Sequence, residues 1–113
     1  MIEIYALNQN ELLDDAQFHT LLSYVSSEKK SRIHRYLRRA SAQQALLSDL
    51  LARSIIHDKL SIKNRDIHFG KNDYGKPFLL GKNDFHFNLS HSGDWVVCAI
   101  SDNVVGSVRG CSR

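Results

Sequence analysis

The chain has 113 residues, of which 42% are apolar and 24% charged, which suits one small soluble globular domain and excludes a collagen-like chain, a disulfide scaffold and a wholly disordered chain. Fifteen Lys and Arg against twelve Asp and Glu give a net charge of +3, which by itself indicates no class of partner. No apolar run approaches the ~20 residues of a membrane span, and the acidic N-terminal stretch is unlike a secretory signal, so we expect no membrane association and a cytoplasmic location.

The first half of the chain is predicted to be mainly helical, because all six glycines and the single proline lie at or beyond Gly70. A β-leaning apolar segment comes first, and apolar residues at helical spacing follow it. Ser26 and Ser27 are typical helix caps, and Ser41 followed by Gln44 has the spacing of a capping box. The predicted elements are a strand over 2–7 and helices over about 12–24, 27–40 and 41–59.

The second half is predicted to be a set of strands and turns. Apolar and polar residues alternate from Phe85 to Ser90, which is typical of a half-buried strand, and an apolar run fills 95–100. The Ser92-Gly93-Asp94 turn between them predicts a hairpin. A short strand over 66–69 and a turn over 72–77 precede it. The predicted fold class is therefore α+β, with helices packed on a small antiparallel sheet.

A cluster of cations lies in the second predicted helix. Six fall within eleven residues: Lys29, Lys30, Arg32, Arg35, Arg38 and Arg39. They indicate either a solvated helix face or an anion site, because clustered Lys and Arg donate charge-assisted hydrogen bonds to phosphate oxygens. Composition does not choose between nucleic acid and a polyphosphorylated small molecule, although no nucleic-acid-binding signature is present.

Two turn segments are further candidates. In Asn88-Leu89-Ser90-His91-Ser92-Gly93, adjacent strand residues face opposite ways, so Ser90 and His91 do not suit a nucleophile–base pair, and they suit a phosphate cradle better. In Tyr74-Gly75-Lys76-Pro77, the glycine and proline would fix the direction of Lys76. Both segments are also compatible with ordinary turns that only cap their own backbone. Cys98 is expected to be a buried thiol, and Cys111 an incidental exposed one.

Four motifs in order resemble a known family. They are Ser-x-Glu-Lys-x-x-Arg at a helix start, the segment Leu46-Leu47-Ser48-Asp49-Leu50-Leu51-Ala52-Arg53-Ser54, the Tyr-Gly-Lys-Pro turn, and the segment from Phe87 to Trp95. Together they resemble the N-terminal half of the surfactin-type 4′-phosphopantetheinyl transferases. The resemblance covers residues 1–106 and implies one half of a pseudo-twofold α+β fold with coenzyme A between the halves.

The resemblance also implies an activity. Such enzymes use a divalent metal, usually Mg²⁺, to transfer phosphopantetheine from coenzyme A to a serine of a peptidyl or acyl carrier protein. By resemblance, Lys29 and Arg32 lie near the 3′-phosphate of coenzyme A, with Arg32 where Lys is frequent. Lys76 lies at the nucleotide, and Ser90 and His91 meet the phosphates. Ala45 replaces a threonine that contacts the 3′-phosphate in some members.

The resemblance ends at Gly106. Val108 and Gly110 stand where the family has the Asp and Glu that hold Mg²⁺, so we expect the metal site to be lost. The tail 107–113 is expected to be divergent, with the C-terminal subdomain and its Trp-x-x-Lys-Glu motif absent. A frameshift is one explanation, because codons for 109–112 read one base later can encode Glu-Asp-Val-Ala. An open frame encoding the motif in the downstream DNA would support it.

Three functional hypotheses follow. The first is a truncated transferase half, inactive alone and without catalytic residues of its own. The second is a half-domain that binds coenzyme A weakly. The third, which we disfavour because it leaves both turn segments unexplained, is a small basic nucleic-acid-binding domain with salt-dependent affinity. We also expect that an exposed half-interface promotes dimerisation.

Overall fold

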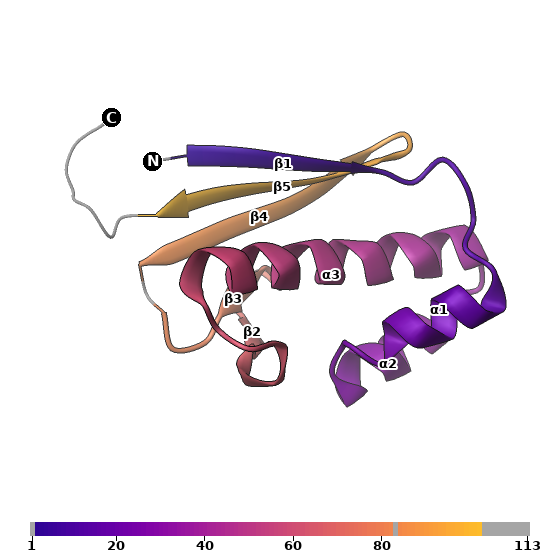
Figure 1. Cartoon of the computed structure of the whole chain (residues 1–113), viewed down its shortest axis with the longest axis horizontal. Helices are drawn as coiled ribbons and strands as arrows, with labels where there is room; N and C mark the ends of the chain where they lie inside the picture. Colours follow the sequence, from indigo (N-terminus) through magenta and orange to yellow (C-terminus); the bar gives the residue numbers. More distant parts are fainter. Residues whose placement is uncertain (1, 83, 103–113) are drawn as a thin grey trace.

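A computed structural model describes residues 2–82 and 84–102, in which the long helix α3 packs against a sheet made of β1, β5 and β4 (Figure 1). The elements, in chain order, are β1 (Ile2–Asn8), α1 (Asp15–Leu22), α2 (Ser27–His34), α3 (Arg39–Leu60), a 3-10 turn η1 (Asn64–Asp66), β2 (Phe69–Lys71), β3 (Pro77–Leu79), β4 (Phe85–Ser92) and β5 (Trp95–Asp102). The predicted α+β class is confirmed.

The larger sheet is antiparallel with the order β1-β5-β4. β4 and β5 form the predicted hairpin, in which Ser92 lies opposite Trp95. The two-residue turn between them requires Gly93 at a φ of 58°, a conformation that suits glycine. β1 pairs with the other edge of β5, from Ile2 opposite Ser101 to Asn8 opposite Trp95. The first and last strands of the described chain are therefore neighbours.

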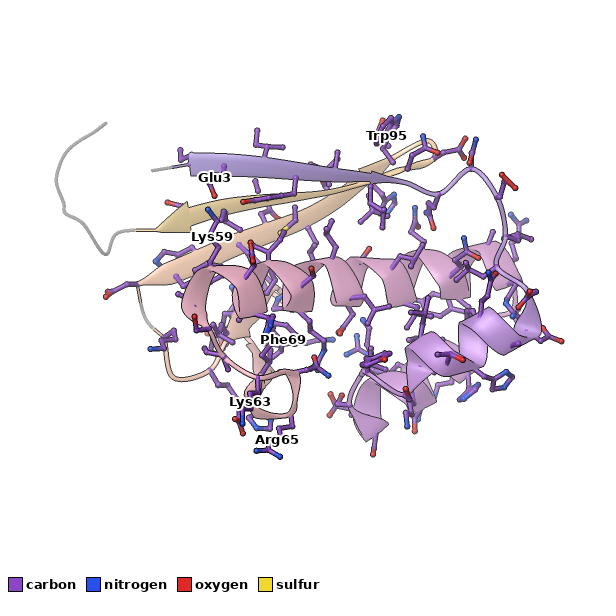
Figure 2. All side chains as sticks on the ribbon, viewed as in Figure 1. Glu3, Lys59, Lys63, Arg65, Phe69 and Trp95 are labelled. Carbon is purple, nitrogen blue, oxygen red and sulfur yellow. The ribbon has the colours of Figure 1, made fainter. Side chains whose placement is uncertain are left out.

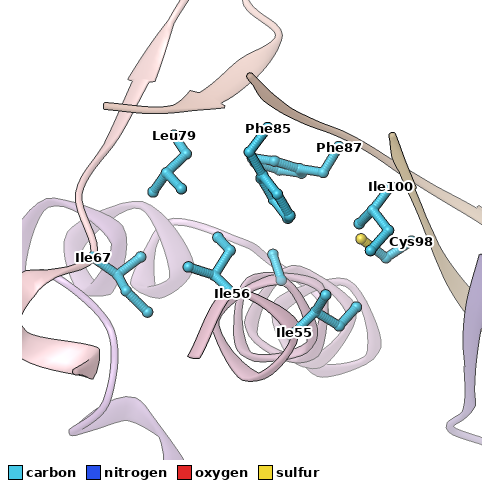
Figure 3. Packing of buried hydrophobic residues seen from close by; sticks show 9 residues of the cluster. Ile55, Ile56, Ile67, Leu79, Phe85, Phe87, Cys98 and Ile100 are labelled. Carbon is cyan, nitrogen blue, oxygen red and sulfur yellow. The ribbon is translucent and has the colours of Figure 1, made fainter. Parts of the chain in front are cut away.

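The main core lies between α3 and the inner face of this sheet. One face of the second half of α3 supplies Ala52, Ile55 and Ile56, and the strands supply alternate residues (Figure 3). The cluster comprises Ala52, Ile55, Ile56, Ile67, Leu79, Phe85, Phe87, Cys98 and Ile100. Cys98 is fully buried as predicted, and burial raises the pKa of its thiol to about 11, so it stays protonated at neutral pH.

A second apolar cluster holds α1 and α2 against the first half of α3. Its buried residues are Phe18, Leu22, Val25, Ile33, Ala42 and Leu46. Asp14 and Gln17 form a reciprocal capping box at the start of α1, and the Ser26 hydroxyl accepts from the Lys29 amide at the start of α2. The predicted cap at Ser26 is confirmed, whereas α1 is shorter than the predicted 12–24.

The predicted start of the third helix at Ser41 is wrong. α2 ends at His34, and α3 begins at Arg39, so Ser41 lies inside α3. The reason is tertiary: the Arg39 guanidinium stacks 3.9 Å from the Phe18 ring centre and bonds Asp15 at 3.0 Å, which fixes the first residue of α3 on α1.

The predicted strand over 66–69 is also displaced. Its first residue closes η1, and the strand is instead β2, which pairs antiparallel with β3 in a separate two-stranded sheet. Pro77 occupies the first position of β3, where a missing N–H is tolerated. This small hairpin lies next to β4, and Leu79 of β3 packs with Phe85 of β4 in the main core (Figure 3). No helix in the described part of the chain is both long and apolar enough to cross a membrane.

Candidate functional site

A pocket of about 980 Å³ lies where α2, α3, the β2–β3 hairpin and β4 meet. Its polar wall includes Lys29 and Arg32 from α2 and Lys71 from β2. Its apolar wall includes Phe69, Pro77, Leu80, Phe87 and Leu89. A pocket lined by both cations and apolar side chains suits a ligand with both an anionic part and an apolar or flat part.

Three of the five residues expected at the site line this one pocket: Lys29, Arg32 and His91. They come from two elements about sixty positions apart in the sequence, and the fold brings them together. The other two, Lys76 and Ser90, are not among the lining residues. Lys76 is exposed between Gly75 and Pro77, which do line the pocket.

Ser90 and His91 lie on opposite faces of β4, because side chains alternate along a strand. Leu89 and His91 border the pocket, whereas Ser90 is exposed and lies opposite Val97 of β5. In this arrangement the two residues do not contact one ligand in the pocket together through their side chains.

The Tyr74-Gly75-Lys76-Pro77 segment forms the predicted tight turn. The Asn72 carboxamide oxygen accepts from the backbone amides of Tyr74 at 2.9 Å and Lys76 at 3.0 Å. The Gly75 amide donates to the Asn72 carbonyl at 2.9 Å, and Gly75 has a φ of 80°. The turn therefore depends on a glycine conformation that other residues adopt at a cost.

Lys29 is the most perturbed cation of the pocket. Burial lowers the pKa of its half-buried ammonium, and the charges of Arg32, Lys71 and Arg53 lower it further, while Asp49 acts in the opposite direction. Three like charges near a desolvated ammonium create a local excess of positive potential. An anion entering the pocket would relieve that repulsion.

The prediction from sequence missed a buried ion pair in the pocket wall. Arg53 Nε donates to Asp49 Oδ1 at 2.6 Å, with both side chains about nine-tenths buried. Both residues lie within the motif identified on α3, and an acid four residues before a base on a helix is a signal that could have revealed them. Lys71 was missed because β2 was not predicted at that position.

Comparisons with known proteins identify the same family that the sequence motifs resemble. A family described as "4′-phosphopantetheinyl transferase, N-terminal" matches residues 14–103. The chain belongs to the 4′-phosphopantetheinyl transferase family. The matched region includes every element that lines the pocket, from α2 through β4.

Three relatives illustrate the match. The 4′-phosphopantetheinyl transferase gsp of Aneurinibacillus migulanus is 44% identical over 94% of this chain and 44% of its own length. The 4′-phosphopantetheinyl transferase Sfp of Bacillus subtilis (strain 168) is 34% identical over 93% of this chain and 47% of its own length. The L-aminoadipate-semialdehyde dehydrogenase-phosphopantetheinyl transferase of Xenopus laevis is 39% identical over 73% of this chain and 29% of its own length. The chain thus spans less than half the length of each of these relatives.

The described residues offer no cluster of metal ligands for the Mg²⁺ ion that the family resemblance implies. Among residues 2–82 and 84–102, no group of three or more His, Cys, Asp and Glu side chains could hold a metal ion. The two positions expected to have lost their acids, Val108 and Gly110, lie outside the described residues. Cys111 lies outside them as well.

Proposed function

We propose that this chain is the coenzyme A-binding, N-terminal subdomain of a surfactin-type 4′-phosphopantetheinyl transferase. The family transfers 4′-phosphopantetheine from coenzyme A to a serine of a peptidyl or acyl carrier protein, and we extend to this chain only the binding step. The observation that carries the proposal is the convergence of Lys29, Arg32 and His91 on one pocket in a chain of this family.

The pocket suits the two chemical parts of coenzyme A. Lys29, Arg32 and Lys71 offer positive charge to the nucleotide phosphates, and Arg32 can donate two parallel hydrogen bonds to one phosphate. The apolar wall that includes Phe87 and Leu89 offers a surface for an uncharged part of the ligand. Ala45 also lines the pocket and has no hydroxyl to donate, which is consistent with a weaker contact to phosphate.

We propose that binding occurs without transfer. Valine and glycine at 108 and 110 provide no carboxylate at the positions where the family holds its metal. The charge that develops on a departing phosphate would then lack its main stabiliser. We propose residues 1–106 as the binding subdomain and 107–113 as a divergent tail that does not restore these acids.

Titration calorimetry with coenzyme A tests the binding step. We expect the wild-type chain to release heat, and Lys29→Gln to weaken the affinity by about tenfold, because a charge-assisted hydrogen bond contributes roughly 1.5–3 kcal/mol. Lys30→Gln is the matched control, since it removes the same charge from the neighbouring position, which does not line the pocket. No heat at millimolar coenzyme A would refute the proposal.

The same preparation tests the absence of transfer. Incubation with coenzyme A, Mg²⁺ and an apo carrier protein should leave the mass of the carrier protein unchanged. A carrier protein that gains the mass of phosphopantetheine over repeated turnovers would contradict this part of the proposal. Steeply salt-dependent binding of duplex DNA or RNA, without binding of coenzyme A, would favour the nucleic-acid hypothesis instead.

We further propose self-association through the outer face of the larger sheet. Ile2 and Ile4 of β1 are 73% and 70% exposed, and Trp95 of β5 is 47% exposed. Figure 2 shows Trp95 on the side of the sheet away from α3. Apolar side chains exposed together on one sheet face are typical of an interaction surface, and a second copy of this chain would cover them.

A further inference from the structure

The Arg53 side chain contacts more partners than its ion pair with Asp49 requires. Its Nη1 donates to the Asn64 side-chain oxygen at 3.1 Å and to the Asn64 backbone carbonyl at 3.3 Å, and the Ile67 carbonyl lies at 3.5 Å. A buried guanidinium is retained at low cost only where its donors are paired. These partners all lie in the segment that leads from α3 into β2, so Arg53 fixes the start of the β2–β3 wall of the pocket.

Arg53 also contacts that wall through an aromatic ring. The guanidinium carbon lies 5.2 Å from the centre of the Phe69 ring, within the range of a cation–π contact. Phe69 is the first residue of β2, and Lys71 is its last. The Phe69 ring also packs edge-on against the Phe87 ring of β4, with the ring centres 5.5 Å apart. Arg53 therefore contacts the first residue of the strand that carries Lys71.

Asn64 links the segment before β2 to the segment before α2 through its side-chain amide. Its side-chain oxygen accepts from Arg53, and its side-chain nitrogen donates to the Tyr24 carbonyl at 2.8 Å, forty positions earlier in the chain. Tyr24 lies two residues before Ser26, whose hydroxyl caps α2 by accepting from the Lys29 amide at 3.1 Å. Both ends of the Asn64 amide are thus used, one by Arg53 of α3 and one by the Tyr24 carbonyl just before α2.

We propose that Arg53 and Asn64 are positioning residues that hold the α2 wall and the β2–β3 wall at the separation that anion binding requires. Asp49 keeps the Arg53 guanidinium in place from α3. The proposal rests on the proposed function for the identity of the anion, but the geometry it assigns exists without a ligand. Small displacements of charged groups reduce binding strongly when the ligand must contact both walls.

Asn64→Ala is the informative substitution. Asn64 belongs to neither apolar cluster, so the variant should keep both cores and fold. Asn8→Ala is the matched control, because it removes an exposed hydrogen bond to the Asn10 amide, 3.1 Å long, from the end of β1. We expect Asn64→Ala to weaken coenzyme A affinity by about tenfold, as for loss of a hydrogen bond to a charged group, and Asn8→Ala to leave it unchanged.

A second measurement needs no ligand. Amide chemical shifts and hydrogen exchange of Lys29 and Lys71 should change in Asn64→Ala and not in Asn8→Ala, because the walls are then no longer joined. A merely structural role would lower the melting temperature and leave these signals and the affinity of the folded fraction unchanged. Arg53→Lys should keep the ion pair to Asp49 but lose the shared contacts to Asn64, and so reproduce the effects of Asn64→Ala.

The outcomes separate the two proposals. Wild-type affinity together with wild-type amide signals at Lys29 and Lys71 in Asn64→Ala would overturn the positioning role and leave the proposed function intact. If the wild-type chain does not bind coenzyme A, the proposed function fails, and the ligand-free amide signals alone decide whether Arg53 and Asn64 position the walls.

Discussion

Lys29 shows at the scale of one residue how the fold changes the chemistry of a side chain. In the sequence Lys29 is one of six cations within eleven residues, and nothing in the spacing distinguishes it from Lys30. In the structure Lys29 lines the pocket and Lys30 does not, and burial lowers the pKa of the Lys29 ammonium. The protonation of a lysine in such a site depends both on pH and on the charge of an anion bound beside it.

The lowered pKa of Lys29 predicts a pH dependence of anion binding. The ammonium attracts phosphate only while it is protonated, so affinity should be full below its lowered pKa and fall as pH rises through it. The decline in affinity should begin at a lower pH than for an ordinary lysine, whose pKa is about 10.4. Titration calorimetry with adenosine 3′,5′-bisphosphate, which has no thiol to ionise, should reveal it.

Lys29→Arg provides the control for this pH profile. A guanidinium stays protonated throughout the range, so its affinity should be nearly constant where that of the wild type declines. The same decline in both proteins would show that Lys29 is not the titrating group.

At the scale of elements, the β2–β3 hairpin is the part of the site that depends most on a single backbone conformation. Its turn uses Asn72 as a side-chain acceptor and Gly75 at positive φ, and Gly75 borders the pocket. The turn was predictable because asparagine, glycine and proline each have a known role in turns. The strands on either side were not, because three residues each carry too little periodicity to identify them.

Gly75→Ala should destabilise this hairpin by about 1–2 kcal/mol, the cost of placing a non-glycine residue at positive φ. A Cβ at Gly75 would meet nothing within 4 Å, so the cost is conformational and not steric. We expect faster hydrogen exchange at the Leu80 amide, which donates to the His68 carbonyl at 2.9 Å. Gly75→Asn, which tolerates this backbone region, should exchange more slowly than Gly75→Ala. Equal hydrogen exchange of the Leu80 amide in Gly75→Ala and in the wild type would contradict the prediction that the turn depends on glycine at positive φ.

At the scale of the whole molecule, two faces have opposite characters. The pocket between α2, α3, the β2–β3 hairpin and β4 is lined by cations, and the outer face of the three-stranded sheet exposes Ile2 and Ile4. Among the described residues β1 is an edge strand of this sheet. The proposed ligand binding and the proposed self-association therefore use different surfaces and can be tested separately.

Ile4→Lys should abolish the proposed self-association without affecting coenzyme A binding. A charged side chain in the middle of the exposed face would have to be desolvated in a dimer. Sedimentation velocity should show a concentration-dependent dimer for the wild type and a monomer for the variant. Thr20→Lys adds the same charge at an exposed position of α1, outside the sheet, and should dimerise like the wild type. A wild-type chain that stays monomeric at all concentrations would end the proposal.

The sequence by itself determined the α+β class, the β4–β5 hairpin, the turn at Gly75, the burial of Cys98 and the family, because each depends on local periodicity, turn chemistry or ordered motifs. The tertiary structure alone decided where α3 begins, because that depends on the contact of Arg39 with Phe18. It also decided that Lys29 and His91 share a pocket while Ser90 faces away. Contacts between residues tens of positions apart follow from packing, and neither the start of α3 nor the grouping of the pocket residues could be predicted from local pattern.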